Sequence, residues 1–244
     1  MNRKIACITG SSRGIGKSIA ECFAAGGYDI VLNCRKDTLA MEQVKHTLES
    51  TYSVHCFPLV MDVSDSNAVS EGFALVASEF GKIDVLVNNA GISYFGLLSD
   101  MTDLQWQQVL STNLSSAFYC SKAVIPSMVR RKSGRILNIS SIWGNSGASY
   151  EVAYSATKGG LNTLTKALAK ELAPSNIPVN AISCGVIDTD MNKHLSQEEL
   201  DSLIEEIPAC RLGTPEEVGQ LAFLLSQAPT YLTGQIVTLD GGFL

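Results

Sequence analysis

Tyr154 and Lys158 have the residue types and the spacing needed to move a proton. In a helix, positions i and i+4 project from the same face one turn apart, so the phenol and the ammonium would be neighbours. A tyrosine with a pKa of ~10 exchanges protons poorly at neutral pH, and a nearby positive charge favours the phenolate and lowers that pKa. A serine pair, Ser140 and Ser141, precedes these two residues. The pattern indicates acid–base chemistry if the rest of the chain positions it.

The elements that must position this pair alternate along the chain. Short apolar runs rich in Val, Ile and Leu alternate with longer amphipathic stretches, which is typical of a parallel sheet covered by helices on both faces. The expected strands are residues 4–9, 29–33, 54–61, 83–88, 135–139, 178–183 and 235–239. The expected helices are residues 15–25, 38–50, 66–80, 103–131, 149–172 and 215–226. The sequence therefore predicts a single α/β domain over residues 1–244, a doubly wound Rossmann fold with seven parallel strands.

Length, charge and cysteine usage exclude several classes of function. The 244 residues are 45% hydrophobic, enough for a large core, and the net charge of −6 argues against a nucleic-acid surface. The basic cluster Arg130, Arg131, Lys132 and Arg135 is expected to be a solvated helix end. Seven cysteines without C-x-x-C spacing suggest neither disulfides nor zinc, and His46, His55 and His194 form no ligand pattern. The first apolar run is too short for a signal or membrane segment, so we expect a cytoplasmic protein.

The turn after the first strand has the composition of a phosphate-binding loop. Glycines there let the backbone approach a pyrophosphate, and the next helix offers free N–H groups and a positive dipole end. At the carboxyl end of the first strand of a parallel sheet, such a loop faces the dinucleotide crevice. Glycine-rich turns also follow ordinary strands, so the composition of the loop alone does not establish a phosphate site. Its position at the carboxyl end of the first strand supports that prediction. The expected contacts are Gly10, Ser12, Arg13, Gly14, Ile15 and Gly16.

The end of the second strand favours NADP over NAD. An acidic residue there would bind the ribose 2′-hydroxyl of NAD, but the chain has Asn33 and Arg35, and Asp37 comes late enough to cap the next helix. Arg13 and Arg35 could clamp a 2′-phosphate together, unless both are ordinary surface residues. Further cofactor contacts are expected after the third and fourth strands, although turn chemistry would explain the same residues. They are Asp62, Val63, Asn89, Ala90 and Gly91.

Five motifs together resemble the short-chain dehydrogenase/reductase family over essentially the whole chain. They are T-G-x-x-x-G-x-G at residues 9–16, N-N-A-G at 88–91, Asn113, Ser141, and Y-x-x-x-K from Tyr154 to Lys158. The resemblance implies that Tyr154 supplies a proton to a carbonyl and that Ser141 hydrogen-bonds the same oxygen. It also implies that Lys158 lowers the pKa of Tyr154 and binds the nicotinamide ribose. Asn113 would hold a water that connects Lys158 with solvent, although a buried Asn can simply bond the local backbone.

A departure from the family pattern lies after the sixth strand. Cys184 stands where the family usually has proline, so a rigid backbone angle is lost, and a packing role for this thiol is favoured over a catalytic one. Gly185, Ile187 and Thr189 still match the family's contacts with the nicotinamide. The segment 185–208 breaks the strand–helix alternation and contains a short helical stretch at 195–200, so it is a candidate substrate lid.

Within the family, scaffold features resemble the bacterial 3-oxoacyl-[acyl-carrier-protein] reductases. The resemblance therefore implies a 3-oxoacyl thioester of fatty acid biosynthesis as the leading substrate, which an acidic acyl carrier protein could deliver to the Arg130–Lys132 cluster. Ser141 and Tyr154 would bind its carbonyl, and Tyr94, Phe95, Trp143 and Met191 would line its pocket. The same pocket would suit a hydroxysteroid, a sugar acid or another secondary alcohol, and a dinucleotide-binding sensor without turnover is a further alternative. The family resemblance also implies a homotetramer.

Overall fold

The computed structural model describes residues 3–193 and 195–244. Met1 and Asn2, and with them the start of the chain considered for a signal segment, lie outside the described residues, as does His194.

Seven parallel strands form one sheet in the order β3-β2-β1-β4-β5-β6-β7. This confirms the predicted doubly wound fold. The order reverses between β1 and β4, so the chain leaves their carboxyl ends toward opposite faces of the sheet and a crevice forms there. Strand β5 pairs in register with β6, which places Ser141 opposite Cys184. The strands are β1 (Ile5–Ile8), β2 (Asp29–Cys34), β3 (Cys56–Val60), β4 (Val85–Asn88), β5 (Arg135–Ser141), β6 (Val179–Cys184) and β7 (Ile236–Leu239).

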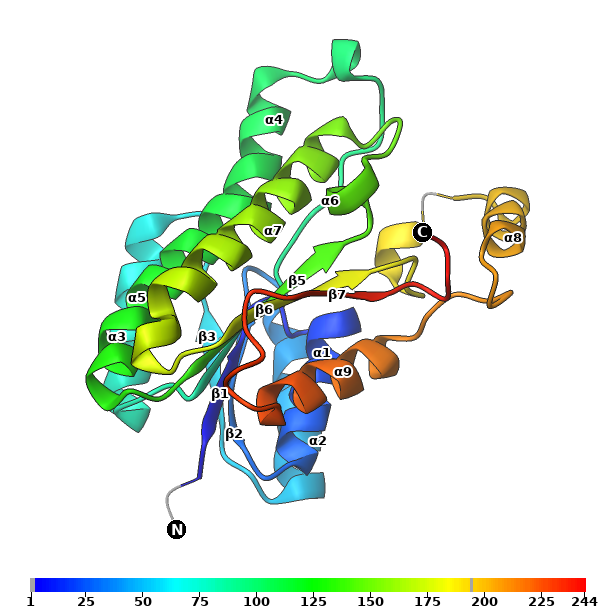
Figure 1. Cartoon of the computed structure of the whole chain (residues 1–244). Coiled ribbons are helices and arrows are strands. Elements are labelled where there is room, and N and C mark those ends of the chain that lie inside the picture. Colours follow the sequence, from blue (N-terminus) through cyan, green and yellow to red (C-terminus); the bar gives the residue numbers. More distant parts are fainter. Residues whose placement is uncertain (1–2, 194) are drawn as a thin grey trace.

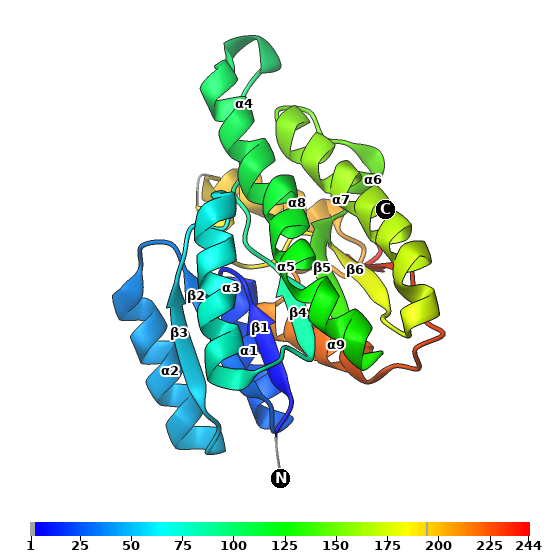
Figure 2. The ribbon, with the colours of Figure 1, turned by 90° about the vertical axis from the view of Figure 1, so that its left-hand side faces the viewer.

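Helices cover both faces of this sheet (Figure 1). One face carries α1 (Gly14–Ala25), α2 (Thr38–Tyr52) and α9 (Pro215–Gln227), and the other carries α3 (Ser66–Phe80), α5 (Ser116–Arg131) and α7 (Val152–Leu172). Figure 2 shows α3, α5 and α7 in front of the strands, with α9 behind them. The remaining helices are α4 (Asp103–Leu110), α6 (Trp143–Ser146) and α8 (Gln197–Glu206). The crevice thus opens at the end of the sheet from which α4 and α8 project.

Each face of the sheet has its own apolar layer. Phe23, Leu32 and Val218 belong to the layer under α1 and α9, and Leu86 and Met128 to the layer under α3 and α5. The strands alternate their side chains between these layers, which explains why they read as continuous apolar runs. The core therefore holds the carboxyl ends of β1, β4, β5 and β6 in fixed positions around the crevice.

Two predicted helices differ from the structure. The stretch 103–131 is broken by a π-helical turn at Ser111–Ser115, which separates α4 from α5. The stretch 149–172 begins only at Val152, because Tyr150 adopts a left-handed φ of 63°. The start of α9 is as predicted, with a capping box between Thr214 and Glu217.

The basic cluster at the end of α5 is only partly solvated, contrary to expectation. Arg131 forms an ion pair with Asp84 at 3.0 Å and donates to the carbonyl of Ile83 at 2.6 Å. Arg135 donates to the carbonyl oxygens of Leu225 and Ala228. Both guanidinium groups satisfy acceptors at the amino-terminal end of the sheet, so only the remaining two cations, Arg130 and Lys132, are exposed.

Most of the thiols lie in the core of the domain. All seven cysteines are free, and five of them are buried. No helix among the residues that the structure describes has the length and apolar character needed to cross a bilayer.

Candidate active site

The glycine loop joins β1 to α1 at the crevice. Gly10 and Gly14 have φ values of +65° and +53°, which side chains rarely adopt. A Cβ atom added to Gly16 would lie 2.3 Å from the Gly10 carbonyl oxygen. All three glycines are therefore required by the fold of the loop, and the loop ends at the first turn of α1, whose N–H groups face the crevice.

Polar side chains from β2 and from the turn after β4 hold this loop. Asn33 Oδ1 accepts from the Gly10 amide at 3.1 Å, and Asn33 Nδ2 donates to the Leu59 and Met61 carbonyls at 3.0 Å. Asn89 Nδ2 donates to the carbonyls of Thr9 and Gly10 at 2.9 and 3.1 Å. The amide of Asn33 and the Nδ2 of Asn89 are committed to these bonds, so both residues position the loop.

A cavity of about 1380 Å³ runs from the glycine loop to Tyr154. Pockets for one small ligand are typically ~300–1,000 Å³, so this cavity has room for a dinucleotide and a second molecule. The predicted cofactor residues that line it are Gly10, Ser12, Arg13, Gly14, Ile15, Gly16, Asn33, Arg35, Asp62, Val63, Asn89, Ala90, Gly91, Tyr154, Lys158, Gly185, Ile187 and Thr189. The predicted substrate residues that line it are Phe95, Ser141, Trp143, Tyr154 and Met191.

The two arginines predicted to clamp a 2′-phosphate face different acidic partners. Arg35 lies 3.8 Å from Asp62, and Arg13 lies 3.9 Å from Asp190. Asp62 also accepts from the amide and hydroxyl of Ser64 at 2.9 and 2.6 Å, so its carboxylate fixes a turn. Partial burial raises the pKa of Asp62, but the hydrogen bonds from Ser64 and the charges of Arg35 and Lys36 outweigh this effect and lower it. Both arginine side chains are exposed and line the cavity, each beside its own carboxylate.

Ser141, Tyr154 and Lys158 meet at the other end of the cavity. Ser141 is the last residue of β5, and its side chain hydrogen-bonds the phenol of Tyr154. Lys158 follows one turn later on α7, with Nζ 5.4 Å from the Tyr154 ring centroid. Its Nζ donates to the Ile139 carbonyl at 2.8 Å. A hydroxyl, a phenol and an ammonium thus converge beside Gly91, as the spacing predicts.

The pKa of Tyr154 shifts in the direction opposite to that expected. Burial raises it strongly, and the nearby Cys184 and Glu151 raise it further, whereas the hydrogen bond from Ser141 lowers it. Lys158 directs its ammonium to the Ile139 carbonyl, so in this structure it does not offset burial. Tyr154 is therefore a protonated phenol at neutral pH, and burial makes it hold that proton more tightly than an exposed tyrosine would.

Burial acts on Lys158 with the opposite sign. It lowers the pKa of Lys158 to about 8, because the charged form loses its hydration. Cys184 lies near enough to both groups to influence their pKa values, and burial raises the pKa of its own thiol to about 12. Cys184, the last residue of β6, is therefore a neutral, buried thiol beside Tyr154 and Lys158.

Asn113 occupies the π-helical turn, and its side chain forms a specific contact. Its Oδ1 accepts from the Ile92 amide, and its Nδ2 donates to the Ile92 carbonyl, both at 2.8 Å. A third bond joins Nδ2 to Thr157 Oγ1 at 3.3 Å. The side chain therefore ties the turn after β4 to α7, and only the backbone of Asn113 is left to hold a water.

The segment after β6 crosses the cavity. A Cβ atom on Gly14 would lie 3.6 Å from the Thr189 methyl group, so Thr189 faces the glycine loop. Asn192 donates to the Ile187 carbonyl at 2.8 Å. The helix predicted at 195–200 is longer in the structure, forming α8 with a capping box at Ser196.

Comparison with known proteins identifies this arrangement. A family model described as enoyl-(acyl carrier protein) reductase matches residues 10–244, and one full-length relative, a 3-oxoacyl-[acyl-carrier-protein] reductase of Chlamydia muridarum, is 41% identical. The chain belongs to the short-chain dehydrogenase/reductase family. This dehydrogenase/reductase is 40% identical to the uncharacterized oxidoreductase YmfI of Bacillus subtilis, over 98% of both chains. It is 38% identical to the 3-oxoacyl-[acyl-carrier-protein] reductase FabG of Escherichia coli, over 98% of this chain and 96% of that one.

A solved structure has the same fold as this dehydrogenase/reductase. A candidate gluconate dehydrogenase from Agrobacterium tumefaciens matches it with a TM-score of 0.93 and 34% identity, over 98% of this chain and 95% of that chain. Membership of the family makes the chain an NAD(P)-dependent oxidoreductase, which agrees with the predicted enzyme class. The strained glycines and the large cavity fit a nicotinamide dinucleotide.

The substrate end of the dehydrogenase/reductase differs in part from prediction. Tyr94 is not among the described residues that line the cavity, because its ring folds back over Gly96. Phe95 instead stacks on Tyr150 with ring centroids 5.3 Å apart. Trp143 packs edge-on against Phe243 at 5.8 Å, so the carboxyl-terminal end closes this pocket from within the same chain.

One pair at the substrate end was missed from the sequence. Ser93 Oγ donates to Glu151 Oε1 at 2.8 Å, and both residues line the cavity. Ser93 follows the N-N-A-G motif, and Glu151 stands three residues before Tyr154. Both residues stand close to a family motif in the sequence, and this proximity was the signal that could have identified them.

Proposed function

We propose that the chain is an NADPH-dependent ketoreductase whose most favoured substrate is a 3-oxoacyl thioester. The single observation that carries the proposal is that the hydroxyl groups of Ser141 and Tyr154 lie together in the same cavity as the glycine loop. A pure dinucleotide sensor would need the loop but neither of these hydroxyl groups. The product would be the 3-hydroxyacyl thioester.

The catalytic residues have distinct proposed roles. Reduced nicotinamide supplies the hydride that reaches the carbonyl carbon. Tyr154 Oη delivers the proton to the carbonyl oxygen, and Ser141 Oγ hydrogen-bonds that oxygen as negative charge develops on it. Lys158 returns a proton to the tyrosine and binds the nicotinamide ribose. Asn113 maintains the route from Lys158 to solvent, with its side chain fixing the π-helical turn.

The preference for NADPH rests on the charges at the adenosine end. Arg13, Lys17, Arg35 and Lys36 line this end of the cavity. Arg35 would leave Asp62 to contact a 2′-phosphate, which offers a stronger charge-assisted partner than an exposed ion pair 3.8 Å long. The glycine loop would bind the pyrophosphate, and Gly91, Gly185, Ile187 and Thr189 would surround the nicotinamide end.

The thioester substrate is supported by relatives and by the apolar pocket. Several full-length relatives are named 3-oxoacyl-[acyl-carrier-protein] reductases, and Phe95, Trp143 and Met191 line the substrate end. On this proposal the enzyme would act in cytoplasmic fatty acid biosynthesis. The candidate gluconate dehydrogenase favours a second function, oxidation of a sugar acid or other secondary alcohol.

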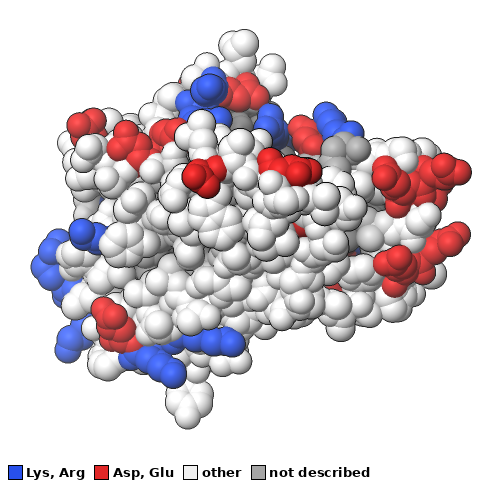
Figure 3. Space-filling view, turned by 90° about the horizontal axis from the view of Figure 1, so that it is seen from above, with Lys and Arg blue, Asp and Glu red and all other residues white. Residues whose placement is uncertain are grey.

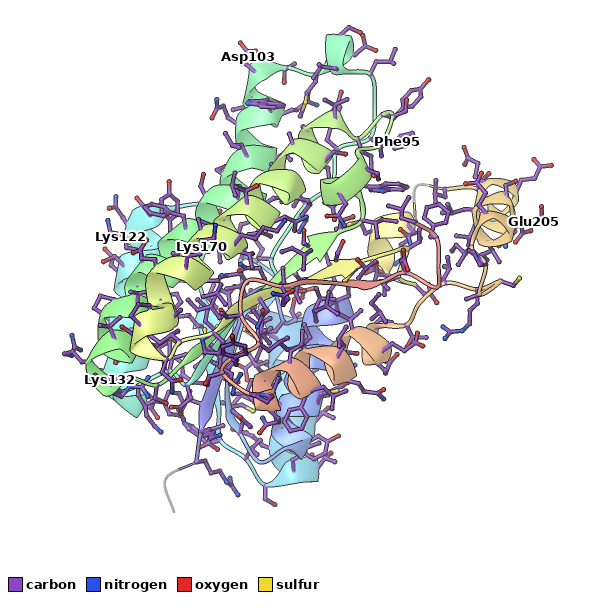
Figure 4. All side chains as sticks on the ribbon, viewed as in Figure 1. Phe95, Asp103, Lys122, Lys132, Lys170 and Glu205 are labelled. Atoms are coloured by element: carbon purple, nitrogen blue, oxygen red, sulfur yellow. The ribbon has the colours of Figure 1, made fainter. Side chains whose placement is uncertain are left out.

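Carrier-protein docking is supported only indirectly. The exposed cation Lys132 lies at the end of the molecule away from Phe95 (Figure 4). An acyl carrier protein bound there would reach an active site only if a second chain presented its own cavity nearby. An apolar groove lined by Leu114, Phe118, Tyr119 and Leu164 offers a surface for such pairing. We therefore propose the homotetramer together with carrier docking, and light scattering of the purified protein would measure the assembly.

Measuring NADPH oxidation with acetoacetyl thioesters and a panel of ketones tests the proposed function. Turnover of the thioester above all simple ketones would support the proposal. Faster reduction of NADP+ with a sugar acid or a hydroxysteroid, measured in the oxidative direction, would favour the alternative dehydrogenase. Tight NADPH binding without turnover of any ketone or alcohol would favour the sensor. Tyr154→Phe serves as the matched control, because it removes one hydroxyl and keeps the ring.

A further inference from the structure

Glu151 places a carboxylate at the substrate end of the cavity. It lies just before α7, three residues ahead of Tyr154, and it is only partly exposed. Its Oε1 accepts from Ser93 Oγ at 2.8 Å, which fixes the carboxylate between the turn after β4 and the start of α7. The charge reaches the reacting group, since Glu151 is one cause of the raised pKa of Tyr154. A substrate bound to Tyr154 would therefore lie within the field of Glu151.

Cations that could offset this charge lie elsewhere among the described residues of the cavity. Arg13, Lys17, Arg35 and Lys36 belong to the glycine loop and to the end of β2. Lys158 is the one described lining cation beside Tyr154, and its ammonium is committed to the Ile139 carbonyl at 2.8 Å. An anionic group near the reacting carbonyl would thus meet the Glu151 carboxylate, and the cation closest to it, Lys158, already has an acceptor in the Ile139 carbonyl.

The segment after β6, which also lines the cavity, is acidic as well. Asp188 and Asp190 line the cavity after β6, and Asp190 is paired with Lys193 at 2.6 Å. Figure 3 shows acidic groups gathered at the end of the molecule formed by α8, on which Figure 4 labels Glu205. The acidic residues of α8 are Glu198, Glu199, Asp201, Glu205 and Glu206. These groups add to the field of Glu151 without replacing it beside Tyr154.

We propose that Glu151 is a specificity-determining residue that makes the enzyme select ketones without a carboxylate near the reacting carbonyl. This inference rests on the proposed role of Tyr154 as proton donor. It assigns the substrate to neutral ketones, such as a 3-oxoacyl thioester or ester. It excludes free 3-oxo acids and sugar acids, whose carboxylates would be repelled by Glu151 at close range.

Methyl acetoacetate and acetoacetate test the proposal, because they share one ketone and differ in one negative charge. The readout is the ratio of kcat/KM for the ester to kcat/KM for the acid, measured with NADPH for wild type and for Glu151→Gln. The glutamine removes the charge but keeps an oxygen that can accept from Ser93. The ratio should favour the ester in wild type and fall at least tenfold in Glu151→Gln, about 1.4 kcal/mol.

A matched control separates charge from local structure. Ser93→Ala removes the hydrogen bond of 2.8 Å and leaves the Glu151 charge, so the ester-to-acid ratio should stay within about threefold of wild type. An equal ratio in wild type and Glu151→Gln would overturn the proposal. So would an equal fall of the ratio in both variants, because loop structure would then set the selectivity.

The proposed function can fail separately from this inference. If wild type reduces neither compound, the ketoreductase assignment to 3-oxoacyl substrates is wrong. The affinities of the ester and of the acid for the NADPH-loaded protein are then measured from the change in NADPH fluorescence. Their ratio is compared between wild type and Glu151→Gln. A tenfold lower ratio of ester to acid affinity in Glu151→Gln would still support the role of Glu151, and an unchanged ratio would refute it.

Discussion

Replacing Lys158 with Met should stabilise the cofactor-free protein at neutral pH and remove its activity. The Lys158 side chain belongs to a residue that is 4% exposed, and burial lowers its pKa from 10.5 to about 8. At pH 7 the native state therefore contains an ammonium group that water would solvate better in the unfolded chain. Methionine has a similar length and no charge, so it fills the same space.

The size of the effect follows from the two pKa values of Lys158. They differ by about 2.5 units (10.5 − 8), and each unit corresponds to ~1.4 kcal/mol, so the buried charge costs the native state about 3 kcal/mol at pH 7. The lost hydrogen bond to Ile139 offsets roughly 1–2 kcal/mol of the gain in the variant. Between pH 8 and 10.5 the unfolded chain binds more protons at this position than the native state, so wild-type stability rises with pH. The cost should shrink by about 1 kcal/mol at pH 9 and about 2 kcal/mol at pH 10.

Urea unfolding of both cofactor-free proteins at pH 7, 8, 9 and 10 measures this difference. The buried thiols of Cys7, Cys56 and Cys120 have raised pKa values and so destabilise the native state as pH rises above about 9. Because both proteins contain these thiols, their effect cancels in the difference between variant and wild type. A difference that stays constant from pH 7 to pH 10 would refute the lowered pKa of Lys158. Retention of wild-type turnover by Lys158→Met would refute its role in proton return.

Three further variants test other parts of the site. Tyr154→Phe should lower kcat at least a hundredfold while the NADPH Kd, measured by fluorescence titration, stays within about threefold, because the ring is kept and the proton is lost. Arg35→Ala should lower kcat/KM at least tenfold with NADPH and less than threefold with NADH in steady-state assays, and equal losses would contradict binding of a 2′-phosphate. Asn113→Ala should lower the free energy of unfolding by about 2–3 kcal/mol in urea titrations, because it removes three hydrogen bonds and leaves the Ile92 amide and carbonyl without these partners. A loss below about 1 kcal/mol would show that the contact with Ile92 adds little.

The sheet could be predicted from the sequence because strands buried on both faces are continuous apolar runs. The break in the helix at 103–131 could not, since Ser111, Thr112 and Asn113 are all compatible with an α-helix. The π-helical turn coincides with a tertiary contact, the pairing of Asn113 with the backbone of Ile92 more than twenty residues away. Helical periodicity reports only which face is apolar, so it does not reveal such a contact.

The candidate site likewise has some features that local sequence predicts and others that depend on tertiary contacts. The spacing of Tyr154 and Lys158 correctly predicts that they are neighbours, because helix geometry fixes it. It does not predict the direction of their pKa shifts, because burial and the acceptor at Ile139 come from β5. Likewise, Asn33 and Asn89 follow strands as cofactor residues would, but hydrogen bonds across the crevice commit their side chains to the glycine loop.

Burial shifts the pKa values of Tyr154 and Lys158 in opposite directions, and the two shifts together determine which group donates a proton to the other. Burial favours the neutral form of each group, which keeps the tyrosine protonated and makes the ammonium the stronger acid of the two. A phenolate left after proton delivery would therefore take its next proton from Lys158. With a pKa of about 8, Lys158 is still mostly protonated at pH 7 and can recover its proton from water at the same pH. Lys158 can thus return a proton to the tyrosine and recover its own from water without a large pKa mismatch with solvent.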